Sequence, residues 1–190
     1  MCNYPDFSKQ AYQKMRTLSN FSTGRNVIIL LALFLFANFV LIPAIYPKFE
    51  TLDTMSAYSP EEAYNLFSNY GESGRNYYII IELTLDIIYP LITALLFSLS
   101  TLYTFQRAFP GKSGIHNLAV IPFGVMLADY LENFCIVLML LNYPRELTNL
   151  ARLSNIFTNI KFVLSPVELL LVIIGLIGWL IQFIRTKRKK

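Results

Sequence analysis

The chain has 190 residues, of which 55% are hydrophobic and only 15% charged, with a net charge of +4 at neutral pH. A soluble globular protein has roughly 25% charged residues, so this composition excludes an ordinary soluble domain. The positive charge does not indicate nucleic acid as a partner, because five of the sixteen basic residues lie in the last six positions, directly after an apolar stretch. Such a tail is typical of a segment that contacts anionic lipid headgroups.

Four apolar stretches are long enough to cross the core of a bilayer, which takes about 20 residues of α-helix. The first of them has no charged residue in twenty positions. The predicted fold is therefore all-α, a polytopic integral membrane protein whose single domain, 1–190, is a four-transmembrane-helix bundle. The predicted spans are 27–46, 77–105, 115–141 and 162–184.

Short interfacial helices are predicted outside the spans. The residues Ser-Pro-Glu-Glu at 59–62 have the pattern of a capping box with proline at the first helical position, which predicts a helix over 59–70. Gly71 can adopt the left-handed conformation that ends such a helix. Apolar residues at helical spacing predict two more surface helices, one over 144–159 that leads into the fourth span and one over 7–21.

The distribution of lysine and arginine predicts the orientation in the membrane. Eleven of these sixteen residues lie in the N-terminal segment, in the connection between the second and third spans, and in the C-terminal tail. The other two connections hold the remaining five. Because positively charged loops stay on the cytoplasmic side, we expect a cell-membrane protein with both termini in the cytoplasm.

Five carboxylates lie inside the predicted spans, where each charged side chain costs about 2.5–3.5 kcal/mol to insert. Spanning a membrane does not require acidic residues, so their presence needs another explanation. They are Glu82 and Asp86 in the second span, Asp129 and Glu132 in the third, and Glu168 in the fourth.

Polar residues in three of the spans recur at three, four or seven positions, and residues at these spacings share one face of a helix. Exposure of such a face to lipid is costly, so we expect the three faces to point inward, toward one another. The residues that share a face are Arg75, Glu82 and Asp86 in and before the second span, Asp129, Glu132 and Asn133 in the third, and Lys161 and Glu168 in the fourth.

The expected arrangement is an acidic cleft open to the outside, with Arg75 and Lys161 at its rim. Lys161 and Glu168 by themselves are expected to form a structural ion pair. Five acids then face two bases, so part of the negative charge has no partner in the protein. Either bound protons or a bound cation must neutralise the remaining negative charge.

This excess of negative charge predicts a pocket that binds or translocates a cation: a proton, a hard metal ion or a small amphipathic cationic ligand. Oxygen-only ligands favour hard divalent cations such as Mg²⁺ or Ca²⁺. For a metal ion the expected ligands are Asp86, Asp129 and Glu132, and for an amine Tyr89 and Tyr130 add aromatic faces. The lipid bilayer is the first expected partner, and a pore would require a homo-oligomer, since four helices line too little space.

Two other functions fit the same residues. Paired carboxylates can act as acid and base, so the protein could be a membrane-embedded enzyme for a lipid or isoprenoid, with Arg75 holding the headgroup. Alternatively, the acids fix the register of the helices in a structural or accessory membrane subunit. The sequence assigns no catalytic residue and does not distinguish an enzyme from a binding protein.

Overall fold

The computed structural model describes residues 18–46 and 48–188, which form helices and loops with no strand. The predicted all-α bundle with four candidate membrane spans is confirmed, since four helical stretches are long and apolar enough to cross a membrane. The predicted surface helix over 7–21 lies mostly outside the described residues. The four stretches are Gly24–Ile45, Gly71–Ala108, Gly114–Asn142 and Thr148–Lys187.

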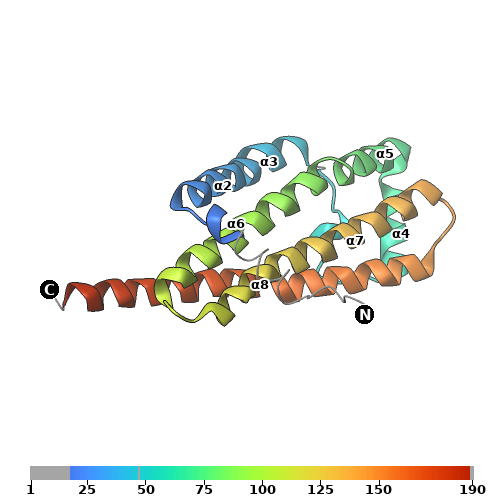
Figure 1. The fold of residues 1–190 in the computed structure, drawn as a ribbon. Helices are drawn as coiled ribbons and strands as arrows, with labels where there is room; N and C mark the ends of the chain where they lie inside the picture. The colour runs from blue at the N-terminus through green and yellow to red at the C-terminus, as the bar shows by residue number, and fades with distance from the viewer. Residues whose placement is uncertain (1–17, 47, 189–190) are drawn as a thin grey trace, which may run out of the picture.

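The four stretches contain six α-helices, and a further one, α4, lies between the first two stretches (Figure 1). A π-helical turn, Ala37–Leu41, joins α2 to α3, and a 3₁₀-helix, Ser113–Val120, leads into α7. The α-helices are α2 (Gly24–Phe36), α3 (Ile42–Ile45), α4 (Pro60–Asn69), α5 (Gly71–Glu82), α6 (Leu85–Ala108), α7 (Ile121–Asn142) and α8 (Thr148–Lys187).

Helix α6 lies at the centre of the bundle and contacts α2, α7 and α8. It runs parallel to α8, whereas α7 runs antiparallel to both (Figure 1). The close approach of α8 to α6 depends on Gly175, where a Cβ atom would lie 2.1 Å from Thr104 Oγ1. In contrast, α2 packs along α6 at the periphery and has no buried residue.

The second predicted span is not one continuous helix, and this part of the prediction is wrong. Helix α5 ends at Glu82 and α6 begins at Leu85, with Thr84 in a non-helical conformation (φ −126°, ψ −76°). The Thr84 hydroxyl donates to the carbonyl oxygen of Ile80 at 2.5 Å, so the side chain takes over a carbonyl that a continuing helix would pair with a backbone N–H. The break changes the direction of the chain between the two acidic residues of this span.

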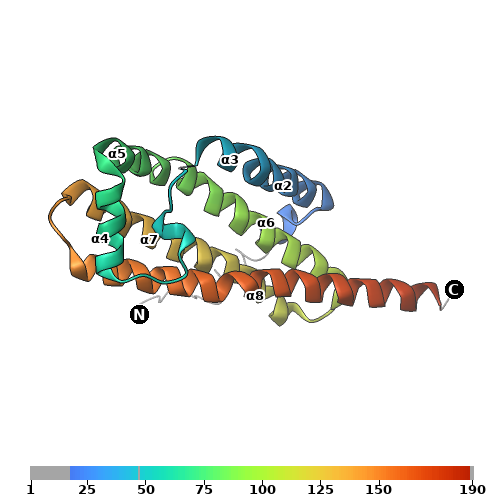
Figure 2. The same cartoon turned by 180° about the vertical axis from the view of Figure 1, so that it is seen from behind.

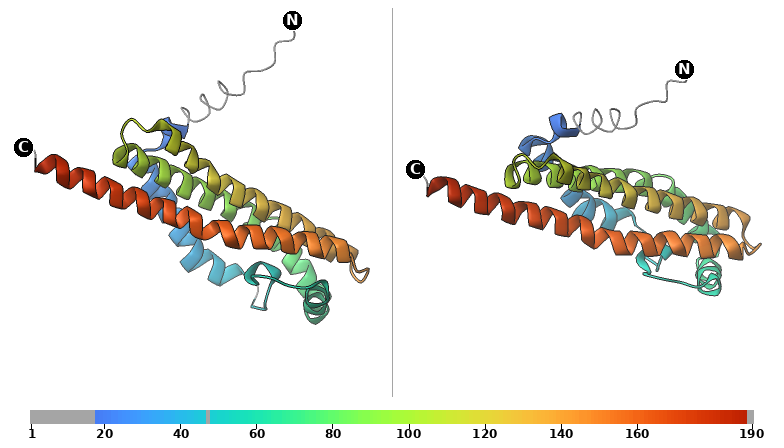
Figure 3. Two further views of the ribbon diagram at one scale, coloured as in Figure 1. Left: turned by 90° about the horizontal axis from the view of Figure 1, so that it is seen from below. Right: turned by 60° about the horizontal axis from the view of Figure 1, so that its bottom comes forward.

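The fourth predicted span and the interfacial helix over 144–159 are instead one helix. Helix α8 has 40 residues and continues past the rest of the bundle at its C-terminal end (Figures 1 and 3). The physical reason is the absence of a helix breaker, since residues 148–165 contain neither glycine nor proline.

The predicted capping box of α4 is confirmed. Ser59 Oγ accepts a hydrogen bond from the Glu62 N–H at 3.1 Å, and Glu62 Oε2 accepts one from the Ser59 N–H at 2.6 Å. Gly71 has φ +64°, as expected for the residue that separates α4 from α5. Helix α4 crosses one end of the bundle, which we call the α4 end (Figure 2).

An apolar cluster closes the α4 end. It combines residues of α4 and of the loop before it with residues of α5, α7 and α8. Its buried members are Leu52, Tyr58, Ala63, Tyr64, Phe67, Tyr78, Ile136, Met139, Leu140 and Ala151.

Candidate functional site

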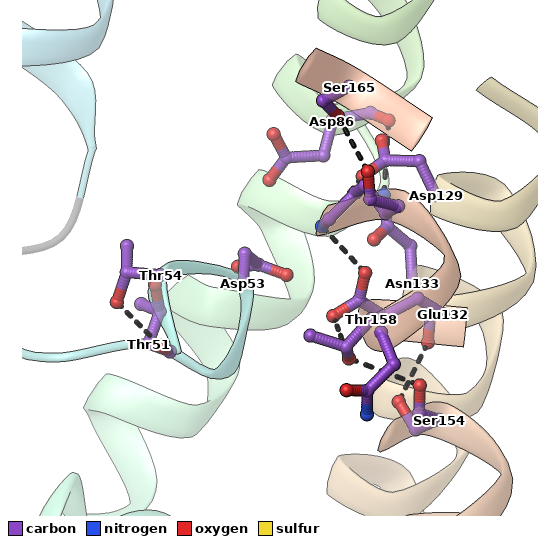
Figure 4. Close-up of polar contacts among 12 residues, drawn as sticks. Thr51, Asp53, Thr54, Asp86, Asp129, Glu132, Asn133, Ser154, Thr158 and Ser165 are labelled. Atoms are coloured by element: carbon purple, nitrogen blue, oxygen red, sulfur yellow. Dashed lines mark hydrogen bonds and ion pairs between the residues drawn. The ribbon is translucent and has the colours of Figure 1, made fainter. Parts of the chain in front are cut away.

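Lys161 of α8 forms ion pairs with two acids of α7. Its Nζ lies 2.9 Å from Asp129 Oδ1 and 2.6 Å from Glu132 Oε2. The two acids share a face of α7 because they are three residues apart. Thr158 of α8 completes this group by donating its hydroxyl to Glu132 Oε1 at 2.6 Å. We call Asp129, Glu132, Thr158 and Lys161 the lysine cluster (Figure 4).

The lysine cluster changes two expectations from the sequence. Lys161 was expected at the rim of an open cleft and paired with Glu168, but its partners are Asp129 and Glu132. These two acids were expected to share a metal ion with Asp86. The ammonium group of Lys161 instead provides the positive charge beside them, because it reaches across from the neighbouring helix.

Tyr58 connects the loop before α4 to α8 beside the lysine cluster. Its hydroxyl donates to Ser154 Oγ at 2.7 Å, and its backbone N–H donates to Asn155 Oδ1 at 3.0 Å. Burial raises the pKa of the Tyr58 hydroxyl above its ordinary value, so the group stays protonated and remains a donor. These bonds hold the loop against the bundle.

A second group contains three acids and no base. Carboxylate oxygens of Asp53, Glu82 and Asp86 all lie within 4.8 Å of one another. Glu82 is the last residue of α5 and Asp86 is near the start of α6, so the helix break separates them along the chain. Asp53 comes from a 3₁₀ turn, Leu52–Thr54, in the loop before α4. We call these three residues the acidic cluster; Figure 4 labels Asp53, left of its centre, and Asp86, above and to the right of Asp53.

Asp53 is the member of the acidic cluster that sequence reasoning missed. It is held by two tyrosine hydroxyls, which donate to its Oδ2 from Tyr46 at 2.7 Å and from Tyr78 at 2.9 Å. Asp53 lies in an irregular loop, where no helical spacing relates it to the acids of the spans. Its sequence neighbours, Thr51 and Thr54, are typical of an ordinary turn, so the sequence carries no signal for its position.

Glu82 is buried, Asp53 and Asp86 are half-buried, and four of their carboxylate oxygens are buried without a hydrogen-bond partner. Glu82 is 1% exposed, and neither of its carboxylate oxygens has a partner. The buried Asp53 Oδ1 and Asp86 Oδ2 atoms also lack one. Within residues 18–46 and 48–188, the ion pairs are those of Lys161 with Asp129 and Glu132, so no described lysine or arginine neutralises the acidic cluster.

Two donors on α7 fix the position of α6 beside the cluster. Pro90 has no N–H, so the carbonyl oxygen of Asp86, four residues earlier, loses its usual helical partner. Asn133 supplies the missing donor with its side-chain amide at 3.2 Å. One residue further along, the Ile87 carbonyl oxygen accepts a hydrogen bond from the Tyr130 hydroxyl at 2.7 Å. Asn133 and Tyr130 thus contact the backbone of α6.

A pocket of about 320 Å³ lies where the break between α5 and α6 faces α7. Its volume is within the range of small-molecule sites in proteins. Four of its lining residues are polar, and four are apolar. The polar ones are Glu82, Asp86, Tyr130 and Asn133, and the apolar ones are Leu83, Ile87, Phe134 and Val137.

The predicted opening at the end of the bundle is closed, which corrects the expectation of an acidic cleft open to the outside. Leu52, Phe67 and Tyr78 are fully buried and cover the acidic cluster from the α4 end. The pocket opens instead through the side of the bundle, where Leu83 and Phe134 are exposed. The loop before α4 closes the end because it folds back onto the bundle and places Asp53 beneath it.

Arg75 does not join the acids that it was expected to face. Its guanidinium carbon lies 4.0 Å from the centre of the Tyr143 ring, and its Nη1 donates to the Phe67 carbonyl oxygen at 2.9 Å. The seven-residue spacing between Arg75 and Glu82 predicted that the two side chains share one face of a helix. The guanidinium instead packs on an aromatic ring and a free carbonyl at the α4 end.

Two other residues of the expected set lie apart from the acidic cluster. Tyr89 faces the first span, where its hydroxyl donates to Oδ1 of Asn38 in the π-helical turn at 3.2 Å. Glu168 is buried on α8 and forms no ion pair with any residue that the structure describes. Periodicity placed Glu168 on an inward face, whereas Tyr89 was expected as an aromatic face for an amine. Because α6 contacts α2 as well as α7 and α8, Tyr89 can point inward without facing the acidic cluster.

The acidic cluster has the ligand chemistry of a hard cation. Three carboxylates from three segments converge, and carboxylate oxygens are preferred by Mg²⁺ and Ca²⁺. The set differs from the expected metal ligands in that Asp53 and Glu82 take the places of Asp129 and Glu132. Only Asp86 is common to both.

No protein-family model, curated protein or solved structure matches this chain.

Proposed function

We propose that this multi-pass helical protein binds a cation at the acidic cluster, Asp53, Glu82 and Asp86. The observation that carries the proposal is Glu82. Its side chain is 1% exposed, both of its oxygens lack a hydrogen-bond partner, and two further carboxylates lie within 4.8 Å. A bound cation would satisfy all three groups at once.

The repulsion within the cluster is large enough to need a positive charge. Two unit charges 4.8 Å apart repel by about 3.5 kcal/mol at an effective dielectric constant of about 20. The cluster contains three such pairs, and burial adds a desolvation penalty to each ion. Tyr46 and Tyr78 donate to Asp53, but hydroxyl groups carry no charge that balances three carboxylates.

The lysine cluster supports the same proposal by comparison. Asp129 and Glu132 are buried acids as well, and Lys161 pairs with both of them. The acidic cluster has no such base among the described residues. We therefore assign the positive charge beside it to a bound cation, as a metal ion, an organic ammonium group or a proton.

In this proposal the bundle lies in a cell membrane with both termini in the cytoplasm, as the lysine and arginine distribution indicates. The α4 end then faces outward and the acidic cluster lies in the outer half of the bundle. Acid–base catalysis on a lipid draws on the same carboxylates, but the headgroup contact expected from Arg75 is lost to Tyr143 and Phe67. Cation binding is the function that the acidic cluster supports best.

The experiment is a binding assay on the full chain in phosphatidylcholine nanodiscs. Calorimetric titration with Mg²⁺, Ca²⁺, Mn²⁺, Na⁺ and methylammonium is compared across the wild type, Glu82→Gln, Asp86→Asn and Glu168→Gln. The last variant is the matched control, because Glu168 is another buried glutamate that lies outside the acidic cluster.

We expect at least one of these cations to bind to the wild type and to Glu168→Gln with affinities that agree within twofold. The same cation should bind at least tenfold more weakly to Glu82→Gln and Asp86→Asn. Absence of binding by every cation, or equal binding to Glu82→Gln, would overturn the proposal. Circular dichroism establishes that each variant keeps its helical content.

A further inference from the structure

The pocket extends from Glu82 and Asp86 of the acidic cluster to the outer surface of the bundle. Part of its lining is apolar. Glu82 and Asp86 are among its lining residues, together with four apolar side chains, Leu83, Ile87, Phe134 and Val137. A hydrated metal ion gains no stabilisation from contact with apolar side chains. The combination of acids and alkyl or aromatic side chains fits a ligand with a charged end and a hydrocarbon chain.

The mouth of the pocket lies on a lipid-facing side of the bundle. Leu83, Ile87 and Phe134 are 53%, 48% and 62% exposed, and all three are apolar. Side chains of this kind on the outside of a membrane bundle contact acyl chains. The other route to Glu82, from the α4 end, is covered by buried Leu52 and Tyr78.

The charges around the pocket determine the sign of the ligand. Glu82, whose two buried oxygens have no partner, and Asp86 are among the lining residues, and no lysine or arginine is. The remaining polar residues, Tyr130 and Asn133, use a hydroxyl and an amide on the backbone of α6. A phosphate-bearing headgroup would find no base in the pocket, whereas an ammonium group would meet carboxylates.

We infer that the pocket takes an amphipathic ammonium ligand from the bilayer. The ammonium group lies against Glu82 and Asp86, and the alkyl chain lies along the four apolar side chains. This inference rests on the proposed cation binding and specifies its ligand as a long-chain amine without a phosphate group.

The test uses dodecylammonium as the probe and the full chain in phosphatidylcholine nanodiscs. Ile87→Trp fills the pocket, and Ile88→Trp is its matched control, because Ile88 is the adjacent residue, is 58% exposed and does not line the pocket. Empty nanodiscs measure the amine that dissolves in lipid. Glu82→Gln removes the charge on which the ammonium group depends.

We expect dodecylammonium to bind equally to the wild type and Ile88→Trp, and at least tenfold more weakly to Ile87→Trp and Glu82→Gln. Methylammonium, which has no chain, should lose less affinity in Ile87→Trp than dodecylammonium does. Equal binding of dodecylammonium to these two tryptophan variants would overturn the inference. Displacement of dodecylammonium by phosphatidylethanolamine or by dodecanol would overturn it as well.

A second measurement keeps the test valid if Ile87→Trp fails to fold. Dodecylammonium with a photoreactive group at the end of its chain is crosslinked to the wild-type protein. Labelling is expected at Val137, which lines the pocket and is buried, and labelling confined to lipid-facing residues such as Ile88 and Phe39 would contradict the inference.

The two proposals fail in different ways. If a metal ion or methylammonium binds in a Glu82-dependent manner while dodecylammonium does not, cation binding stands and the amphipathic ligand is wrong. If no cation of any kind binds, the proposed function itself is wrong.

Discussion

Asn133 on α7 donates its side-chain amide to the backbone carbonyl oxygen of Asp86 on α6, at 3.2 Å. Pro90 leaves this carbonyl without its helical donor, because the carbonyl of a residue normally pairs with the N–H four positions later. The proline and the asparagine are 43 positions apart in the sequence, yet they act on the same atom. The contact fixes the start of α6, and with it the position of the Asp86 carboxylate.

Replacing Asn133 by leucine should destabilise the bundle by about 1–3 kcal/mol, because a buried carbonyl loses its donor. In a Pro90→Ala background the restored N–H can pair with the Asp86 carbonyl, so the cost of Asn133→Leu should fall below about 1 kcal/mol. Thermal unfolding of the four variants in detergent measures the difference. Asn142→Leu, on the exposed end of the same helix, is the control and should be near neutral. An equal cost in both backgrounds would show that the bond is unimportant.

Replacing Lys161 by methionine should destabilise the protein by about 3–5 kcal/mol, because Asp129 and Glu132 would remain buried without their base. The triple variant Lys161→Met, Asp129→Asn, Glu132→Gln should recover most of this loss. Exposed Lys112 provides the control, and Lys112→Met should unfold like the wild type. A triple variant as unstable as Lys161→Met alone would contradict this account.

Replacing Gly175 by alanine should cost about 1–3 kcal/mol, since the new Cβ would lie 2.1 Å from Thr104 Oγ1 and 2.9 Å from a Phe105 ring carbon. Gly124→Ala is a matched control on α7, where nothing lies within 4 Å of the added atom. It should be neutral or stabilising, because alanine favours helix over glycine. Unfolding temperatures of the two variants should therefore move in opposite directions, and similar shifts would argue against close α6–α8 packing.

The α4 cap should respond to acid. Hydrogen bonds from the Ser59 backbone N–H and hydroxyl lower the pKa of Glu62 below its ordinary value. Because the pKa is lower in the folded state than in the unfolded state, the carboxylate stabilises α4 above the ordinary glutamate pKa of about 4.3. That contribution is lost as the pH falls through the lowered value.

Hydrogen exchange of the α4 amides, corrected for intrinsic rates, measures this effect between neutral pH and about pH 3. Wild type and Glu61→Gln, which alters an exposed neighbour, should lose protection on acidification. Glu62→Gln should lose protection less, since it has no carboxylate to protonate. Identical pH profiles for Glu61→Gln and Glu62→Gln would refute the role of the cap.

The features that the sequence predicted correctly depend on local patterns. Long apolar runs predicted the four spans, and the residues at 59–62 predicted the cap of α4. In both cases neighbouring residues supply the physical cause, through lipid solubility or through hydrogen bonds across one turn. The orientation of the bundle in the membrane stays a prediction.

The features that the sequence did not predict depend on side-chain contacts that helical spacing does not reveal, one of them local and the others between distant segments. The break at Thr84 follows from a side-chain hydrogen bond to Ile80 that competes with an otherwise helical pattern. Asp53 reaches Glu82 and Asp86 because an irregular loop packs under α4. Helical spacing identified the inward faces, but it could not determine that Lys161 reaches Asp129 and Glu132 rather than Glu168.

The length of α8 has a consequence for how the protein sits in its surroundings. At 1.5 Å per residue its 40 residues extend about 60 Å, whereas a bilayer with its headgroups is about 40–45 Å thick. A helix of this length set upright across a bilayer would extend about 15–20 Å beyond the headgroups, and its last turn carries Arg185 and Lys187.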